Sequence, residues 1–271
     1  MSAKPTTLLA AGNLTQYQEA GQGKALFLLH GSGPGVSGWA NWANGVPMFA
    51  DRWRVVVPDI AGFGFTEFKD DAKYDIKLWV NHLLGIMDAL DIEKASFVGN
   101  SFGGALAIGL AVFAPERVNK LVLLGTPAGE FVQTPGLRGA WEYEPSLDNM
   151  RQLMALFPYD KSLITDAMVQ ARYEASARPG AQQALRKLIP QPAVDGPTLV
   201  KGFPAAVLAK LVAPTLVVHG REDRVVPPEC GLLIANSIPD ADLHLFGHCG
   251  HWVQSEQPRR FVALVRDFLS E

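Results

Sequence analysis

The sequence predicts an α/β protein in which a mostly parallel central sheet is flanked by helices. Short runs of β-branched and other apolar residues alternate along the chain with segments of helical periodicity, which is typical of a parallel sheet covered by helices. The chain has 271 residues, of which 48% are hydrophobic and 19% are charged. This composition is ordinary for a globular protein with a sizeable core, and this length suits one large α/β domain or two small ones.

Apolar runs mark the expected strands, and helical spacing marks the expected helices. We expect strands at residues 25–30, 54–59, 95–100, 120–125, 215–219 and 242–246. We expect helices at residues 76–90, 101–114, 229–237 and 258–269. In the first of these helices, for example, Leu83, Ile86 and Leu90 recur at helical spacing.

The alternation of strands and helices breaks between residues 134 and 205. This stretch has helical patterns at 147–157 and 162–176, several prolines and glycines, and nothing that resembles a β-α-β unit. An insertion between consecutive core strands lies above their carboxyl ends, where it can cover a site. We therefore expect a helical lid at 134–205, inserted into a core formed by residues 1–133 and 206–271.

One short motif carries most of the functional information. Gly99-Asn100-Ser101-Phe102-Gly103 has the G-x-S-x-G pattern, follows an expected strand and opens an expected helix. A serine on so sharp a turn has strained backbone angles, and the glycines beside it let neighbouring segments approach. Its hydroxyl then stands at a helix amino terminus, where free N–H groups stabilise a developing anion. A helix cap is the ordinary alternative for Ser101, but caps seldom lie between paired glycines, so the motif predicts a serine hydrolase.

A nucleophilic serine needs a base and an acid that orients the base. Glu222 and Asp223 both follow an expected strand; Asp223 is favoured because Asp is common in this role, although either could form a surface ion pair instead. His248 and His251 share the Gly-rich loop after the next strand, and the place of His251 just before a helix favours it. The chain order Ser, then Asp or Glu, then His is the one that α/β-hydrolases use, so we expect that fold.

The glycine-rich loop after the first expected strand is a candidate for half of an oxyanion hole. Glycines at 31, 33 and 35 let a backbone N–H turn towards a reacting carbonyl, and the N–H of Phe102 would supply the second donor. A plain glycine turn is the alternative. A phosphate-binding loop is excluded because no Gly-Lys-Ser/Thr follows, and Pro34 and Trp39 interrupt the helix start that a dinucleotide loop requires.

Charge and cysteine content exclude several other classes. The net charge is −3, and no Lys/Arg cluster suggests a nucleic-acid or anionic membrane surface. Cys230 and Cys249 make no disulfide framework, which favours a reducing cytosol. The apolar runs at 8–11 and 103–114 are too short for a signal-peptide core and a membrane span, so we expect a soluble cytoplasmic protein. The His-Cys-x-His order at 248–251 lacks a second ligand pair, so it predicts no metal site.

Six segments together resemble the meta-cleavage product hydrolases. They are HGSGPGVSGWANW at 30–42, PDIAGFG at 58–64, GNSFGG at 99–104, WEYEPS at 141–146, RYEAS at 172–176 and FGHCGHW at 246–252. These enzymes are α/β-hydrolases that split carbon–carbon bonds in ring-fission products of catechols. GNSFGG and the lid segments look most like the branch that acts on single-ring products, the 2-hydroxymuconate semialdehyde hydrolases. The likeness covers nearly the whole chain, but residues 179–202 match less well.

The resemblance implies which residues carry the chemistry. It implies that Ser101, Asp223 and His251 form a catalytic triad. It also implies that the backbone N–H groups of Ser32 and Phe102 form the oxyanion hole.

The resemblance also implies which side chains bind substrate. Arg172, Asn41 and Asn100 would bind the carboxylate and the neighbouring oxygen of a dienoate, because an arginine fork suits a carboxylate. Trp252 and Trp141 would line the same pocket. From the residues alone, Arg172 is more often a solvated surface charge, the asparagines are turn residues and the tryptophans are core.

The reaction implied by the resemblance is hydrolysis of a 2-hydroxy-6-oxo-2,4-dienoate to 2-hydroxypenta-2,4-dienoate and a carboxylic acid. The dienol first becomes its keto form, and then either Ser101 attacks the ketone to give an acyl-enzyme or activated water attacks it to give a gem-diol. No metal or organic cofactor is implied, and the expected partner is the small-molecule dienoate; relatives of this kind often form homo-oligomers. Residues 179–202 are expected to line the distal pocket for the substituent on the ketone.

Two other functions compete with this interpretation. A carboxylesterase or other acyl-transfer hydrolase would share the triad but would have no use for Arg172. A ligand-binding receptor on a hydrolase scaffold would keep the pocket without turnover, which a complete triad disfavours.

Overall fold

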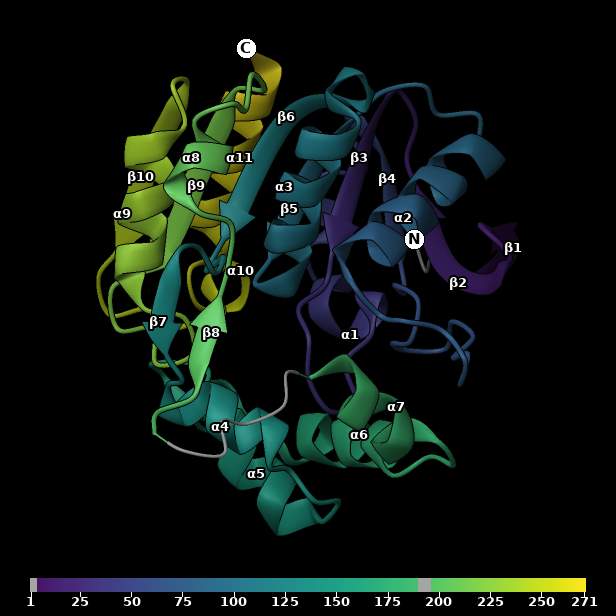
Figure 1. The fold of residues 1–271 in the computed structure, drawn as a ribbon, viewed down its shortest axis with the longest axis vertical. Helices are drawn as coiled ribbons and strands as arrows, with labels where there is room; N and C mark the ends of the chain where they lie inside the picture. Colours follow the sequence, from purple (N-terminus) through teal and green to yellow (C-terminus); the bar gives the residue numbers. More distant parts are fainter. Residues whose placement is uncertain (1–3, 190–195) are drawn as a thin grey trace.

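A sheet of eight strands forms the centre of the structure, a computed structural model that describes residues 4–189 and 196–271 (Figure 1). Its strands are β1 (Thr6–Ala10), β2 (Asn13–Ala20), β3 (Lys24–Leu29), β4 (Trp53–Pro58), β5 (Ala95–Asn100), β6 (Val118–Leu124), β9 (Thr215–Gly220) and β10 (Ala241–Phe246). The order across the sheet is β1-β2-β4-β3-β5-β6-β9-β10, and all neighbours from β4 to β10 are parallel. The predicted α/β architecture is confirmed.

Every strand predicted from the sequence is present, with ends that differ by no more than two residues. The antiparallel hairpin of β1 and β2 is not among the predictions. Its two-residue turn places Ala11 at φ 46° and Gly12 at φ 78°, the left-handed angles that tight hairpin turns require. Such turns usually carry Asn-Gly or Asp-Gly, so Ala-Gly gives a weaker signal, and strands near the sheet edge can stay polar.

Helices cover both faces of the sheet. On one face pack α2 (Ile76–Ala89), α3 (Phe102–Phe113), α8 (Ala205–Leu208) and α9 (Pro228–Ser237), and on the other α1 (Gly38–Trp42), α10 (Val253–Glu256) and α11 (Pro258–Ser270). Along β3, Phe27 and Leu29 face the first group, whereas Leu26 and Leu28 face the second. Because both faces are covered, these strands are continuous apolar runs in the sequence.

Helices α4 (Pro135–Trp141), α5 (Leu147–Met154), α6 (Asp166–Ser176) and α7 (Ala181–Leu188) lie across one end of the sheet (Figure 1). They follow β6 and precede β9, so the predicted helical insertion between core strands is confirmed. A ribbon of β7 (Glu130–Val132) and β8 (Leu199–Lys201) links them to the core. Each ribbon strand has three residues, too few for a recognisable alternating pattern. The lid boundaries at 134 and 205 stay a prediction.

Three short 3-10 helices, η1 (Val46–Met48), η2 (Pro115–Arg117) and η3 (Lys161–Leu163), complete the described elements. Within residues 4–189 and 196–271, no helix has the length and apolar character needed to cross a membrane.

A buried histidine fastens α2 to the edge of the sheet. The ring of His82 is fully buried; its Nε2 donates to the Thr15 hydroxyl at 2.7 Å, and its Nδ1 accepts the N–H of Ala61 at 3.2 Å. The Thr15 hydroxyl itself donates to the Asn13 carbonyl, which assigns the imidazole hydrogen to Nε2. Burial, helped by the nearby His30, lowers the pKa of His82 to about 4. A second proton would therefore break the bond to Ala61.

This histidine predicts acid sensitivity of the fold. The folded pKa lies below the ordinary value of 6.5, so the unfolded chain binds the proton more tightly. Stability is thus lost as the pH falls from 6.5 towards 4, by about 3 kcal/mol over that range. Urea unfolding at pH 7 and pH 4.5 measures the loss. His82→Gln is expected to be less stable at pH 7 but to lose less on acidification; equal losses in both proteins would contradict the assignment.

Candidate active site

Ser101 lies on the sharp turn between β5 and α3. Its backbone has φ 55° and ψ −115°, a conformation that side chains rarely adopt. A Cβ on Gly99 would lie 2.4 Å from the carbonyl carbon of Gly103, and one on Gly103 would lie 2.5 Å from the carbonyl oxygen of Leu29. Only glycine fits at both positions. The N–H of Ser101 donates to the Leu124 carbonyl at 2.7 Å, which ties the turn to β6.

The turn presents Ser101 to a narrow cavity between the sheet and the helical insertion. The accessible volume of this cavity is about 30 Å³. Its lining includes the predicted site residues Ser32, Asn41, Asn100, Ser101, Trp141, Arg172, His251 and Trp252. Phe102 follows directly as the first residue of α3, where N–H groups have no intrahelical acceptor. Candidate residues from distant parts of the chain thus meet at one place.

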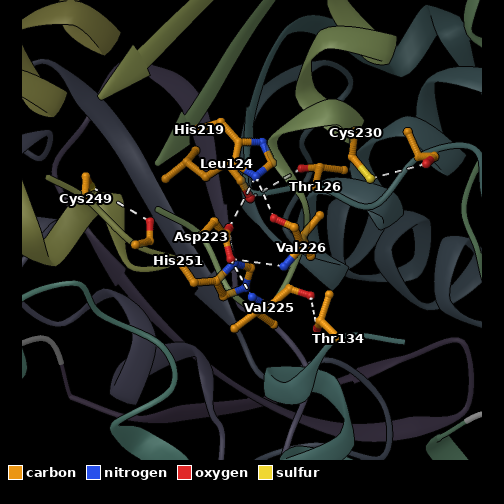
Figure 2. Close-up of polar contacts among 12 residues, drawn as sticks. Leu124, Thr126, Thr134, His219, Asp223, Val225, Val226, Cys230, Cys249 and His251 are labelled. Carbon is orange, nitrogen blue, oxygen red and sulfur yellow. Dashed lines mark hydrogen bonds and ion pairs between the residues drawn. The ribbon is translucent and has the colours of Figure 1, made fainter. Parts of the chain in front are cut away.

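Asp223, in the loop after β9, contacts the imidazole of His251 (Figure 2). Its Oδ2 accepts from Nδ1 of His251 at 2.7 Å, and its Oδ1 accepts from the N–H groups of Val225 and Val226 at 2.8 and 3.0 Å. Burial by itself raises the pKa of Asp223, but the imidazoles of His251 and His219 outweigh burial and hold it well below its usual range. The ionised carboxylate fixes the His251 tautomer whose Nε2 can accept a proton.

Glu222 and His248, the alternatives that the sequence left open for the acid and the base, make other contacts. Glu222 accepts the N–H of Cys249 at 3.0 Å, a bond that lowers the pKa of Glu222. The ring of His248 lies against the ring of Tyr159 in the insertion, with 5.6 Å between the ring centroids, whereas the ring of His251 contacts Asp223. The two histidines of the His-Cys-x-His sequence therefore do not converge.

Ser101 and His251 line the same cavity, but no hydrogen bond between their side chains is formed within the described part of the chain. Bonds between a nucleophile and its base often tighten only in the substrate complex.

The insertion is attached to the His251 loop by residues that sequence reasoning missed. The Phe157 carbonyl accepts the N–H of His251 at 2.8 Å. The Glu256 carboxylate accepts the N–H of Tyr159 at 2.7 Å with one oxygen and the N–H of Gly250 at 2.9 Å with the other. These contacts join backbone groups far apart in sequence, and no local pattern marks them. Glu256 thus ties the insertion to the loop that carries the candidate base.

We expect Glu256→Ala to lower kcat for p-nitrophenyl acetate about tenfold, because losing hydrogen bonds to a carboxylate costs about 1.5–3 kcal/mol and frees the His251 loop. Glu222→Ala is the matched control: Glu222 holds Cys249 in the same loop but forms no hydrogen bond or ion pair with the described residues of the insertion, so kcat should stay within about twofold. Steady-state kinetics and thermal melting of both variants test this. Equal losses of kcat would contradict a special role for the Glu256 tie.

Arg172 of α6 enters the cavity from the insertion. Its Nε donates to the Pro34 carbonyl at 3.0 Å, and its guanidinium lies 5.6 Å and 5.9 Å from the ring centres of Phe157 and Trp252. No carboxylate of the described residues forms an ion pair with it. Burial lowers the pKa of Arg172 to about 10, so the group is still charged at neutral pH. This cation favours an anionic ligand.

The side-chain NH2 groups of two asparagines that line the same cavity as Arg172 have no partner among the described residues. Asn41 accepts the N–H of Gly31 at 3.1 Å, but its Nδ2 is buried without a partner among residues 4–189 and 196–271. The Nδ2 of Asn100 is buried and unpaired in the same sense. Buried donors are normally satisfied, so this pair favours a ligand with oxygen acceptors.

Part of the segment expected to line the distal pocket does reach the cavity. Ile189 lines it, and Leu185 and Leu188 line an adjoining groove of about 530 Å³. Residues 190–195 of that expectation lie outside the described residues.

Comparison with known proteins gives matches along nearly the whole chain. The family described as alpha/beta hydrolase fold matches residues 24–258. A 2-hydroxymuconate semialdehyde hydrolase of Pseudomonas sp. (strain CF600) is 45% identical over 267 residues, which cover 97% of this chain and 93% of that protein. A 2-hydroxy-6-oxo-2,4-heptadienoate hydrolase of Pseudomonas putida is 44% identical and covers 97% of this chain and 95% of its own.

Solved structures agree with these matches. A meta-cleavage product hydrolase from Pseudomonas fluorescens IP01 has a TM-score of 0.91 at 44% identity, covering 98% of this chain and 97% of that one. The 2-hydroxy-6-oxo-6-phenylhexa-2,4-dienoate hydrolase of Rhodococcus sp. strain RHA1 has a TM-score of 0.89 at 29% identity, covering 100% and 99%. The chain therefore belongs to the meta-cleavage product hydrolases, the C–C bond hydrolases of the α/β-hydrolase fold.

Proposed function

We propose that this enzyme cleaves 2-hydroxy-6-oxo-2,4-dienoates of the 2-hydroxymuconate semialdehyde type, with Ser101, His251 and Asp223 as its catalytic triad. The observation that carries the proposal is the charged Arg172 guanidinium, unpaired with any described carboxylate, in the same cavity as Ser101 and His251. A simple ester carries no anionic group that could pair with the guanidinium. Such a dienoate has a carboxylate at one end and an aldehyde or ketone carbonyl at the other, which suits a site with a cation and a nucleophile.

Two further observations support this substrate class. The unpaired Nδ2 groups of Asn41 and Asn100 would donate to the carboxylate and the neighbouring enol oxygen. Trp141 and Trp252 would line the same space. Among the similar proteins, one is named for 2-hydroxymuconate semialdehyde and another for 2-hydroxy-6-oxo-2,4-heptadienoate, which favours small substituents on the carbonyl carbon.

In the reaction we propose, Arg172 first stabilises the dienolate that forms when the enol loses its proton. Protonation of this dienolate at C5 gives the 2-keto form. When the C5–C6 bond later breaks, its electron pair is delocalised into the dienolate and does not remain on C5 as a free carbanion. His251 then takes the proton of Ser101 as the hydroxyl oxygen adds to C6, and the N–H groups of Ser32 and Phe102 bind the oxyanion.

Cleavage of the C5–C6 bond returns the electron pair to the dienolate of 2-hydroxypenta-2,4-dienoate. The acyl group stays on Ser101, and water activated by His251 then releases it as a carboxylic acid. We favour this acyl-enzyme route over direct attack by water because the turn exposes the hydroxyl to the cavity. Trapping in isotopically labelled water distinguishes the two routes, and a gem-diol without acyl-enzyme would overturn the preference.

Relative rates of colour loss test the substrate class. Purified enzyme is mixed with the yellow ring-fission products of catechol, 3-methylcatechol and 2,3-dihydroxybiphenyl. We expect the first two to lose colour much faster than the third, because the similar proteins of 44–45% identity are named for substrates without a phenyl group. Faster loss with the phenyl product would contradict the proposed substituent size, and retention of all three colours would contradict the function itself.

A further inference from the structure

A second histidine contacts the carboxylate of Asp223. Nε2 of His219, the last but one residue of β9, lies 3.2 Å from Oδ2 of Asp223, the oxygen that also accepts from His251 (Figure 2). With the N–H groups of Val225 and Val226 on Oδ1 and Nδ1–H of His251 on Oδ2, the carboxylate accepts three N–H groups, and the His219 ring nitrogen is the fourth nitrogen around it. His219 and His251 therefore share one oxygen.

The surroundings of His219 fix its tautomer. Nε2 also lies 3.0 Å from the Val226 carbonyl, which can only accept, so the hydrogen is on Nε2. The ring is fully buried, and its Nδ1 has no partner among residues 4–189 and 196–271. Gly231 of α9 lies against that nitrogen: a Cβ there would be 2.7 Å from it. A hydrogen on Nδ1 would have no acceptor among the described residues, so the ring N–H is the one on Nε2, which lies between the Val226 carbonyl and Oδ2 of Asp223.

We propose that His219 is a positioning residue that shares Oδ2 of Asp223 with His251 and thereby moderates the basicity of His251. A carboxylate oxygen that accepts two hydrogen bonds offers less negative charge to each donor. Without His219, the carboxylate would favour the imidazolium form of His251 more strongly. The base would then be protonated at a higher pH and would lose activity earlier on acidification. The link to turnover rests on the proposed function, whereas the effect on His251 does not.

The other titratable groups around Asp223 do not compete for this role. Burial, and to a smaller extent the charge of Asp223, raises the pKa of Cys230 in α9 and of Cys249 in the His251 loop, so both thiols stay neutral. Cys230 donates to the Ala128 carbonyl at 3.4 Å and Cys249 to the Gly250 carbonyl at 3.8 Å.

The test compares His219→Leu, which removes the donor, with His219→Gln, whose side-chain amide can replace Nε2–H. Proton NMR of the His251 Nδ1–H resonance follows the titration of His251 without substrate. We expect the midpoint in His219→Leu to rise by about 0.5–1 pH unit and that in His219→Gln to stay within about 0.2 units of wild type. In His219→Leu the acid limb of the pH profile of kcat/KM should shift by the same amount. At a pH below this limb, kcat/KM should then be about three- to tenfold lower than in wild type, with KM little changed.

Gly231→Ala gives an independent variant, because its methyl group displaces the His219 ring while alanine favours the α9 helix. Its midpoint should rise in the same direction. If His219→Leu does not fold, this variant and His219→Gln still decide the question. An unchanged midpoint in every folded donor-removing variant would overturn the proposal, as would a Gln variant that shifts as much as Leu. A shifted midpoint without dienoate turnover would contradict the proposed function and leave the His219 assignment standing.

Discussion

Replacing Ser101 by alanine is expected to abolish hydrolysis of the ring-fission product, with a loss in kcat of at least about 10³-fold. The variant keeps the cavity, Arg172 and the His251–Asp223 pair, so it should still bind the dienoate. Single-turnover mixing followed by absorbance and product analysis measures both effects. Binding with a changed spectrum but without cleavage is the expected outcome.

Ser32→Ala is the matched control for this variant. Ser32 lines the same cavity, but only its backbone N–H has a proposed role, and alanine retains that group. Its kcat should stay within about threefold of wild type. Ser101→Ala with near-normal turnover would contradict Ser101 as the nucleophile and would favour water as the attacking group.

Replacing Arg172 by alanine is expected to lower kcat/KM for the dienoate by about 10²–10³-fold. The guanidinium has no described carboxylate partner, so its interaction with the substrate carboxylate is not duplicated, and a bidentate charged pair contributes about 3–4 kcal/mol. Hydrolysis of p-nitrophenyl acetate should change by less than about threefold, because that ester has no carboxylate. Steady-state kinetics on both substrates measures the selectivity.

Two more arginine variants sharpen this test. Arg172→Lys keeps the charge but not the fork, so we expect an intermediate loss of about tenfold or more. Arg178→Ala removes a neighbouring lid arginine whose guanidinium lies over Phe65 and donates to the Gly64 carbonyl, outside the cavity of Ser101, and should leave kcat/KM within about threefold. Equal losses on ester and dienoate in Arg172→Ala would instead indicate a structural role for Arg172.

The core of the fold was predictable because its strands and helices are long and strongly patterned. Strand β5 and helix α3 were located by an apolar run and a Gly-flanked serine, and both ends of each lie within one residue of expectation. The hairpin of β1 and β2 and the ribbon of β7 and β8 were missed, since their sequences are polar or very short. Strands β7 and β8 pair although they are distant in the chain, and the Ala-Gly turn between β1 and β2 gives only a weak hairpin signal.

The candidate site divides in the same way. Ser101 follows from a local motif, and Asp223 and His251 follow from chain order, but the choice against Glu222 and His248 needed the resemblance or the contacts in space. No sequence motif predicts the roles of Phe157, Glu256 and His219. The first two act through hydrogen bonds to backbone groups, and His219 acts through Asp223. Figure 2 makes the reason visible: His219 and Asp223 lie at the end of β9 and in the loop after it, and they meet His251, from the loop after β10, only in the fold.

The most direct measurement mixes purified enzyme with 2-hydroxymuconate semialdehyde and quantifies the products after the colour is lost. Cleavage between C5 and C6 predicts one equivalent of 2-hydroxypenta-2,4-dienoate and one of the short carboxylic acid for each dienoate consumed. Bleaching without these two products, or ester hydrolysis alongside a persistent yellow colour, would contradict C–C bond hydrolysis at Ser101.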